Sequence, residues 1–105
     1  MGSGRVDDVF DALGDPGRRS LVREIAARGD ATATELAAEL PVTRQAVAKQ
    51  LAVLAEAGLL RATRSGRETR YAVTPGPLRD AVAWMVEVGA AWDERLARLR
   101  DTAAR

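Results

Sequence analysis

Long hydrogen-bond donors are concentrated on one face of a helix that the sequence predicts between Thr43 and Gly58. Thr43 has the side chain of a helix N-cap, and Gly58 suits the left-handed residue that follows a helix. The apolar residues Val47, Leu51 and Leu54 recur at helical spacing and predict the buried face. The positions for contact with a partner are Thr43, Arg44, Gln45, Ala48 and Lys49. Such donors, beside one small residue, suit the edges of DNA bases in the major groove.

A second cationic group is predicted at the tip of a β-hairpin, or wing, that spans about residues 59–73. Apolar and polar residues alternate on both sides of a Ser65-Gly66 turn, as in two paired strands. Three arginines cluster near this turn: Arg64, Arg67 and Arg70. Guanidinium groups at such a tip suit contacts with phosphates or with the minor groove beside the helix. Charge on an exposed hairpin also prevents edge pairing, so this second interpretation stays open.

The positive charge lies in these two segments and not over the whole chain. The formal net charge of the 105 residues is only +1. Residues 43–70 carry six basic and two acidic side chains, a net charge of +4, whereas the remainder carries ten basic and thirteen acidic side chains, a net charge of −3. A local basic patch of this kind is typical of a nucleic-acid-binding surface.

The segment before the donor-rich helix predicts the element that positions it. Thr32 and Glu35 have the spacing of a capping box, and Pro41 is expected to stop the short helix that this box begins. Its inward residues are Leu36, Ala37 and Leu40. A short helix, a turn of about three or four residues and a longer helix make a helix-turn-helix, here over about residues 33–57. The alternative is an ordinary helical hairpin whose charges only solvate its surface.

Two helices are predicted before the helix-turn-helix. The first has apolar residues at helical spacing: Val6, Val9, Phe10 and Leu13. The second begins at Pro16, with Asp15 as its cap, and runs to about Arg28. Arg18 and Arg19 lie near its start, where positive charge opposes the helix dipole. Two interpretations of this pair therefore stay open: the arginines are solvated, or they contact phosphate.

A long helix is predicted over about residues 77–100, after Pro75-Gly76-Pro77. Its main apolar row has the alternating spacing of packed helices and comprises Leu78, Val82, Met85, Gly89, Trp92, Leu96 and Leu99. A second row beside it includes Trp84, and together the rows hold more apolar surface than a core this small is expected to cover. We therefore expect a homodimer through the N- and C-terminal helices, with contacts from Val6, Val9, Phe10, Leu13, Val82, Met85, Gly89, Trp92, Leu96 and Leu99. The alternative is a monomer whose last helix folds wholly onto its own core.

Composition argues against several other classes of protein. The chain has neither Cys nor His, so the usual transition-metal ligands and the usual nucleophile–base pairs of enzymes are absent from the sequence. The remaining candidate metal ligands are the carboxylates of Asp80, Glu87, Asp93 and Glu94. Carboxylates alone favour hard metal ions, and only weakly. No run of about 18 apolar residues predicts a membrane span, and the first residues lack the features of a secretory signal. We expect one cytoplasmic domain over residues 1–105, without a metal, a cofactor or a catalytic site.

In order and spacing, several segments resemble the ArsR/SmtB family of winged-helix bacterial repressors, over about residues 9–99. They are ALGDPGRR at residues 12–19, ELA at 35–37, AVAKQLAVL at 46–54 with AGLL at 57–60, and Gly66-Arg67 with Tyr71. The ending, Pro77-Leu78 followed by WDERL at residues 92–96, resembles a metal-independent branch similar to the SdpR-like autorepressors. The expected fold is therefore a mainly α winged helix-turn-helix of about five helices with a two-stranded wing.

Two departures from the family pattern determine the residues expected to act. Members commonly have Ser and His where this chain has Ala48 and Gln50, so base contacts are expected from Gln45 and Lys49 instead. The family's metal sensors use Cys, or His with carboxylates, and metal or arsenic sensing is therefore not expected here. The expected function is sequence-specific repression by a homodimer, whose two recognition helices enter successive major grooves about 34 Å apart on an inverted repeat of double-stranded DNA. The alternative is a winged-helix module for protein interaction, and the sequence identifies no effector.

Overall fold

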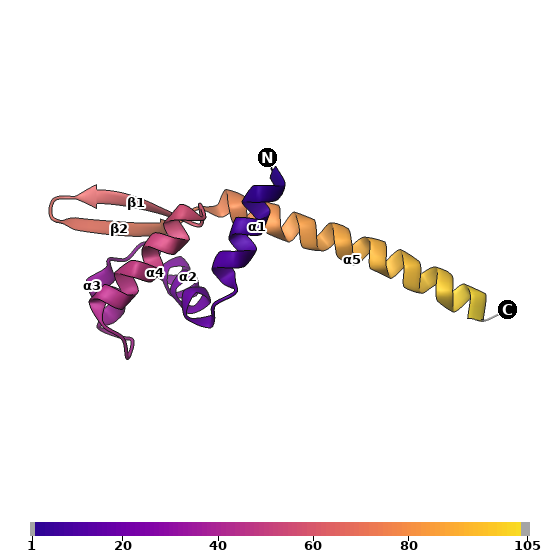
Figure 1. Ribbon diagram of the computed structural model, residues 1–105, viewed down its shortest axis with the longest axis horizontal. Coiled ribbons are helices and arrows are strands. Elements are labelled where there is room, and N and C mark those ends of the chain that lie inside the picture. Colours follow the sequence, from indigo (N-terminus) through magenta and orange to yellow (C-terminus); the bar gives the residue numbers. More distant parts are fainter. Residues whose placement is uncertain (1, 104–105) are drawn as a thin grey trace.

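The computed structural model describes residues 2–103, which form five helices and one two-stranded sheet (Figure 1). The helices are α1 (Gly2–Leu13), α2 (Pro16–Arg28), α3 (Ala33–Ala37), α4 (Arg44–Glu56) and α5 (Pro75–Ala103). The strands β1 (Leu60–Ser65) and β2 (Glu68–Val73) form an antiparallel hairpin between α4 and α5. The predicted mainly α winged helix-turn-helix, with five helices and a two-stranded wing, is confirmed.

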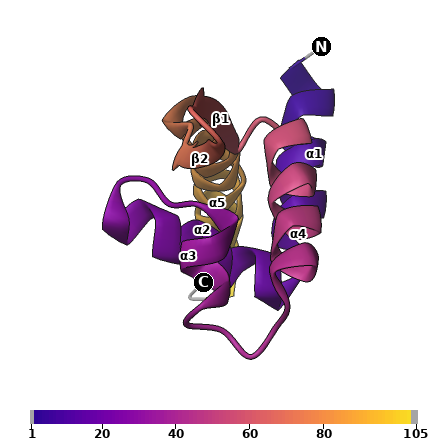
Figure 2. The ribbon, with the colours of Figure 1, turned by 90° about the vertical axis from the view of Figure 1, so that its left-hand side faces the viewer.

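The hydrophobic core lies between the helices and the base of the hairpin. Its buried side chains are Val9, Ala12, Leu21, Ile25, Ala31, Leu36, Val47, Leu51, Leu54, Leu59, Leu60 and Ala81. Viewed from the hairpin end, α5 recedes behind the hairpin (Figure 2). The predicted inward face of α4 is confirmed, because Val47, Leu51 and Leu54 are at most 2% exposed.

Side-chain caps determine where α3 and α4 begin. The Thr32 hydroxyl accepts a hydrogen bond from the Glu35 backbone N–H at 3.1 Å, and the Glu35 carboxylate accepts one from the Thr32 N–H at 2.9 Å. This reciprocal pair is the predicted capping box. The Thr43 hydroxyl accepts in the same way from the Ala46 N–H at 3.1 Å. Each bond satisfies an N–H group that has no acceptor within the helix, so both starts are set by local sequence.

The end of α4 is also set locally, by Gly58. Its φ is +83°, a backbone conformation that other residues rarely adopt. The Gly58 N–H donates to the Ala55 carbonyl and the Leu59 N–H donates to the Leu54 carbonyl, each at 3.0 Å, as in a Schellman motif. The chain therefore turns sharply after the helix and enters the hairpin with Leu59 and Leu60 buried.

Two helix boundaries differ from the sequence prediction. The α-helix α3 ends at Ala37 and not at Pro41, because the N–H groups of Glu39 and Leu40 donate to carbonyls only three residues back, which tightens the chain into a turn. The helix α5 begins at Pro75 and not at Pro77. Both prolines fit its first turn, because N–H groups there have no intrahelical acceptor to lose.

The turn of the hairpin lies one residue later than predicted. The strands pair in register from Leu60 opposite Val73 to Ser65 opposite Glu68, so the loop is formed by Gly66 and Arg67. Gly66 has a φ of +61°, as at the first loop position of a type II′ turn. The base of the hairpin is held by a further β-bridge, in which the backbone of Ala31 pairs with that of Tyr71.

The long helix α5 extends well beyond the body of the protein (Figure 1). The radius of gyration is 18.3 Å and the longest dimension is 68 Å, whereas a compact domain of this length has a radius of gyration of about 13 Å. Near its start α5 packs on α1, where the rings of Phe10 and Trp84 meet edge to face at 5.4 Å. Despite its length, none of the helices formed by residues 2–103 is long and apolar enough to cross a membrane.

The exposed part of α5 carries a large apolar surface. Seven of its large apolar side chains are 48–64% exposed: Val82, Trp84, Met85, Val86, Val88, Trp92 and Leu99. The alternative in which this helix folds wholly onto its own core is therefore not the arrangement of this structure. Val9 departs from the predicted pairing surface, because it is fully buried in the core of its own subunit.

The capping box of α3 predicts a measurable loss of stability on truncation. Thr32→Ala removes the acceptor for the Glu35 N–H and should lower the free energy of unfolding by about 1 kcal/mol. Thr32→Ser keeps the hydroxyl and serves as the matched control. Denaturant unfolding of the two variants measures the difference, and equal midpoints would contradict a role for the cap.

Candidate nucleic-acid interface

The buried face of α4 leaves its donors on the opposite side. Arg44, Gln45 and Lys49 are exposed, whereas Ala48 is half-buried. The Thr43 hydroxyl oxygen is used as a helix cap, but its hydrogen can still be donated to a partner. Within residues 2–103, neither Gln45 nor Lys49 has a side-chain hydrogen bond or an ion pair to another residue. These two long side chains are therefore available for contacts outside the subunit.

A hollow of about 360 Å³ separates α4 from the hairpin. Four of the residues that the sequence predicted for DNA contact line it together: Arg44, Ala48, Arg64 and Arg67. Two acidic residues, Glu35 and Glu68, also line it, and both carboxylates pair with Arg70. The Arg44 guanidinium donates to the Thr34 hydroxyl at 2.9 Å, which directs it along the edge of α3. The Arg64 guanidinium donates to the Gly66 carbonyl at 3.1 Å, next to the turn of the hairpin. The small side chain of Ala48 leaves room between these cations.

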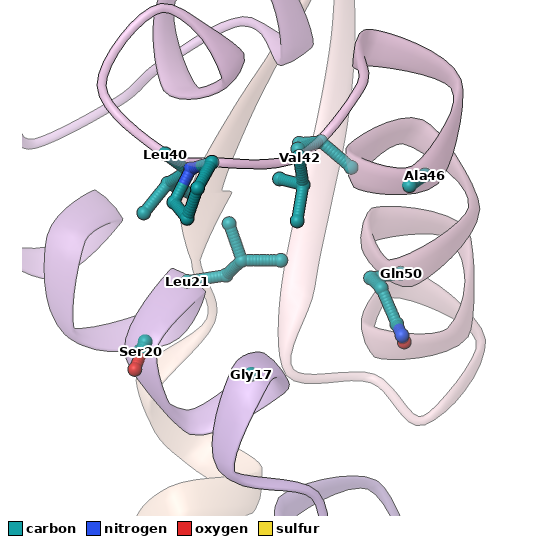
Figure 3. Close-up of a pocket in the computed structure, with 9 residues that line it drawn as sticks. Gly17, Ser20, Leu21, Leu40, Val42, Ala46 and Gln50 are labelled. Carbon is teal, nitrogen blue, oxygen red and sulfur yellow. The ribbon is translucent and has the colours of Figure 1, made fainter.

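The other side of α4 has a different chemistry. A hollow of about 280 Å³ lies between α2, the turn before α4, and α4 itself, and no charged side chain lines it. Figure 3 shows Leu21 pointing into it from α2 and Val42 covering it from the turn. Positive charge is therefore gathered on the side of α4 that faces the hairpin, where an anionic backbone would meet it.

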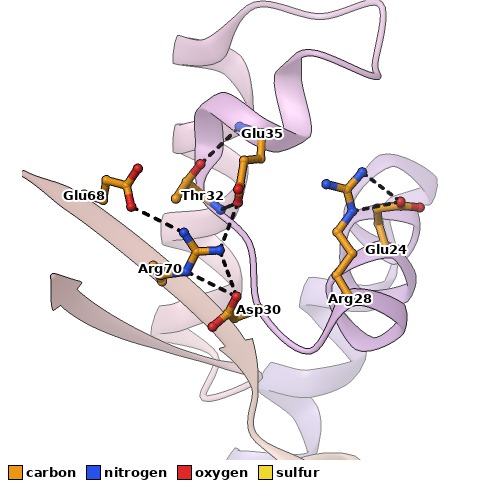
Figure 4. Close-up of polar contacts among 7 residues, drawn as sticks. All are labelled: Glu24, Arg28, Asp30, Thr32, Glu35, Glu68 and Arg70. Atoms are coloured by element: carbon orange, nitrogen blue, oxygen red, sulfur yellow. Dashed lines mark hydrogen bonds and ion pairs between the residues drawn. The ribbon is translucent and has the colours of Figure 1, made fainter.

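Arg70 is placed differently from the other arginines of the hairpin. Its guanidinium contacts three carboxylates, with the Asp30 oxygen at 2.9 Å, the Glu35 oxygen at 3.1 Å and the Glu68 oxygen at 3.3 Å (Figure 4). Asp30 precedes the β-bridge to the hairpin, and Glu35 belongs to the capping box of α3. Arg70 thus braces the hairpin against α3. This differs from the predicted phosphate contact, because three carboxylates already satisfy its charge.

The same cluster shifts the pKa values of Asp30, Glu35 and Arg70. The hydrogen bond from Arg70 lowers the pKa of the Asp30 carboxyl. The pKa of Glu35 is lowered first by the hydrogen bond from the Thr32 backbone and further by the charge of Arg70. The hydrogen bond to Asp30 raises the pKa of Arg70 above its ordinary value. Each of these three shifts favours the charged form of the group at neutral pH.

Arg18 and Arg19 are two structural residues whose partners the sequence did not identify. The Arg18 Nε donates to the Ala12 carbonyl at 2.6 Å, and Arg19 donates to the Leu13 carbonyl at 2.7 Å. Both cations therefore cap the C-terminus of α1, where positive charge is favourable. The signal for this role was the short connection between the two helices, which brings the start of α2 beside the end of α1.

Carboxylates do not gather into a metal site in the part of the chain that the structure describes. No three or more Asp, Glu, His or Cys side chains among residues 2–103 are placed to hold a metal ion. The donors considered from the sequence are exposed at intervals along α5: Asp80, Glu87, Asp93 and Glu94.

The bracing cluster predicts a specific dependence of stability on pH. Because the folded-state pKa values of Asp30 and Glu35 lie below their ordinary values of about 4, their contribution is complete above about pH 5 and is lost as pH falls further. Arg70→Met should therefore destabilise the protein at neutral pH and flatten the acid limb of its stability curve. Arg61→Met, at an exposed position of β1, is the control and should follow the wild type. Denaturant unfolding between about pH 2 and pH 7 tests this, and parallel curves for Arg70→Met and the wild type would contradict it.

Comparison with known proteins agrees with this geometry. Residues 13–63 match the family described as a helix-turn-helix domain. The chain is 35% identical over 91 residues to the uncharacterized HTH-type transcriptional regulator YuzN of Bacillus subtilis (strain 168), covering 81% of this chain and 99% of that protein. It is 27% identical over 81 residues to the transcriptional repressor SdpR of the same organism, covering 77% of this chain and 89% of that protein.

A solved structure extends the likeness to the whole fold. The ArsR-like transcriptional regulator from Rhodococcus sp. RHA1 superposes with a TM-score of 0.83 at 38% sequence identity, covering 96% of this chain and 94% of that chain. The likeness therefore includes the hairpin and the long last helix as well as the helix-turn-helix. The protein belongs to the ArsR family of winged helix-turn-helix transcriptional regulators, a family of DNA-binding proteins and not of enzymes.

Proposed function

We propose that this regulator is a dimeric repressor, a single domain that blocks transcription by binding an inverted repeat in double-stranded DNA. The observation that carries the proposal is the hollow that Arg44, Arg64 and Arg67 line together, beside the exposed donors of α4. This arrangement gives one strand of the DNA backbone a cationic channel while α4 enters the major groove. The likeness to the repressor SdpR supports repression as the direction of control.

Within this interface, α4 supplies the contacts that distinguish base pairs. Gln45 is suited to bidentate hydrogen bonds with adenine, and Lys49 to the two acceptors of guanine. Each such pair discriminates by about 1–3 kcal/mol against the wrong base. Thr43 and Arg44 lie nearer the start of the helix, where they contact phosphates or the outermost base, and Ala48 permits close approach.

The wing contributes more to DNA affinity than to discrimination between DNA sequences. Arg64 and Arg67 are exposed around the turn, and their charges suit phosphates of the flanking backbone. Arg70 acts on this contact indirectly, by holding the hairpin beside α3. The geometry of the cationic channel therefore depends on a side chain that does not itself need to touch DNA.

The dimer forms through α5, with α1 beside it. The half-buried side chains Val6, Phe10 and Leu13 of α1 lie beside the start of α5, whose row comprises the exposed Val82, Met85, Trp92 and Leu99 and the half-buried Leu96. Gly89 lies within this row, and a Cβ atom added there would meet nothing within 4 Å in its own subunit. A small residue at this position permits the close approach of a partner helix. Two-fold pairing of this surface places both α4 helices on one side of the dimer.

The metal-independent branch of the family fits this chain best. Neither Cys nor His occurs in the sequence, so the thiolates and imidazoles of a metal or metalloid sensor are missing. The likeness to SdpR supports the same placement. Relief of repression by a metal ion or a metalloid is therefore not part of this proposal.

The wing arginines predict the salt dependence of DNA binding. If Arg64 and Arg67 each neutralise one phosphate in both subunits, the double variant Arg64→Ala/Arg67→Ala should flatten the slope of log K against log salt by about 3 to 4 units. Arg100→Ala, near the far end of α5, should leave the slope unchanged (Figure 1). Fluorescence anisotropy with a bound duplex between about 50 and 200 mM salt measures both slopes. An unchanged slope for the double variant would exclude the wing from the interface.

The exposed row of α5 predicts the oligomeric state. Trp92 is 57% exposed in the subunit, and Trp92→Asp should convert the dimer into monomers by placing a charge in the apolar interface. Ala90→Asp adds the same charge two residues away, on the opposite side of the helix, and should leave the dimer intact. Sedimentation equilibrium at micromolar concentration distinguishes the two variants. A dimer that survives Trp92→Asp and dissociates with Ala90→Asp would contradict the proposed surface.

A further inference from the structure

Arg18 joins the end of α1 to the middle of the recognition helix α4. It lies in the first turn of α2, and its guanidinium has acceptors on both neighbouring helices. The Nε donates to the Ala12 carbonyl at 2.6 Å and Nη2 donates to the Asp11 carbonyl at 3.3 Å, both near the end of α1. Nη1 donates to the Gln50 side-chain oxygen of α4 at 3.1 Å. One half-buried side chain thereby bridges two helices from a third.

The helices α1 and α4 share the buried core through Val9 and Leu51, but they are separated on the side where Arg18 lies. A hollow of about 350 Å³ lies between them, and its lining is Asp8, Asp11, Ala12, Arg18, Val53, Glu56 and Ala57. The principal contacts of α1 are with α2 and α5, whereas those of α4 are with α2, α3 and β1. Beside this hollow the side chains of the two helices do not fill the space, and the hydrogen bonds of Arg18 link the nearest backbone of α1 to α4 directly.

Gln50 is the residue of α4 that accepts a hydrogen bond from Arg18. It lies on the edge of α4 that faces α2 (Figure 3). Its oxygen is engaged by Arg18, so it is turned away from the cationic side of the helix, which Arg44 and Ala48 occupy. Gln50 is thus a structural contact of α4 and lies outside the set of residues proposed to read bases.

We infer that Arg18 is a positioning residue for operator binding, because it fixes the angle between α1, which lies at the dimer surface, and α4, which reads the DNA. The inference rests on the proposed dimeric repressor. In a two-fold dimer any shift of α4 relative to α1 occurs in both subunits. The distance between the two recognition helices therefore changes by the sum of the two shifts. Arg18 accordingly sets the spacing between half-sites that the dimer accepts.

Variants of the bridge test this through half-site spacing and not through affinity alone. The probes are duplexes with an inverted repeat of the half-site selected from a random pool, in which the half-sites are moved apart one base pair at a time, by about 3.4 Å per step. Gln50→Met keeps the length of the side chain and removes the acceptor, and Arg18→Lys cannot reach both helices at once. For both variants, the ratio of the affinity for the best spacing to the affinity for the neighbouring spacings should fall by about tenfold.

Two matched controls separate positioning from general damage. Arg19→Lys alters the other arginine that caps α1, whose hydrogen bond goes to Leu13 on α1 itself, and Gln50→Glu keeps an acceptor for Arg18. Both should retain the spacing preference of the wild type, while sedimentation shows dimers for every variant. An equal loss of affinity at all spacings, an unchanged profile for Gln50→Met, or an equally broad profile for Arg19→Lys would overturn the inference. A wild type that is monomeric or binds none of the duplexes would instead contradict the proposed function, and the inference would fall with it.

Discussion

Burial of one face of α4 is the constraint on which the DNA-binding surface depends. The side chains of Val47, Leu51 and Leu54 are inserted into the core, and the helix cannot rotate without exposing them. Their burial stabilises the fold by about 1.5–3 kcal/mol for each fully buried side chain. Because an α-helix repeats every 3.6 residues, the same burial directs Gln45 and Lys49 outward. The energy that folds the domain therefore also orients its reading surface.

Local signals explain why most of the fold could be predicted from the sequence. The caps at Thr32 and Thr43 and the positive φ of Gly58 depend only on residues within one turn of a helix, so composition and spacing identify them. The end of α3 and the turn of the hairpin differ from the prediction. Their causes are also local, but they lie in backbone hydrogen bonding, which the residue types do not specify. Tight hydrogen bonds ended α3 before Pro41, and pairing of Ser65 with Glu68 moved the hairpin turn by one residue.

The roles of individual arginines could not be predicted in the same way, because their partners are distant in the chain. Arg70 meets Asp30 across 40 residues of sequence, and Arg18 meets Gln50 across 32. A basic residue beside a turn has the same sequence pattern whether it braces the fold or contacts phosphate. Only the fold shows that Arg70 and Arg18 hold elements together, while Arg67 at the hairpin tip is exposed.

Selection of bound sequences from a random pool of duplexes tests the central claim most directly, because it reports symmetry and DNA recognition together. A dimer that presents two α4 helices on one side should enrich an inverted repeat whose half-sites are centred about 10 base pairs apart, or at a multiple of that distance. Enrichment of a single unrepeated site, or no enrichment at low salt, would contradict the account.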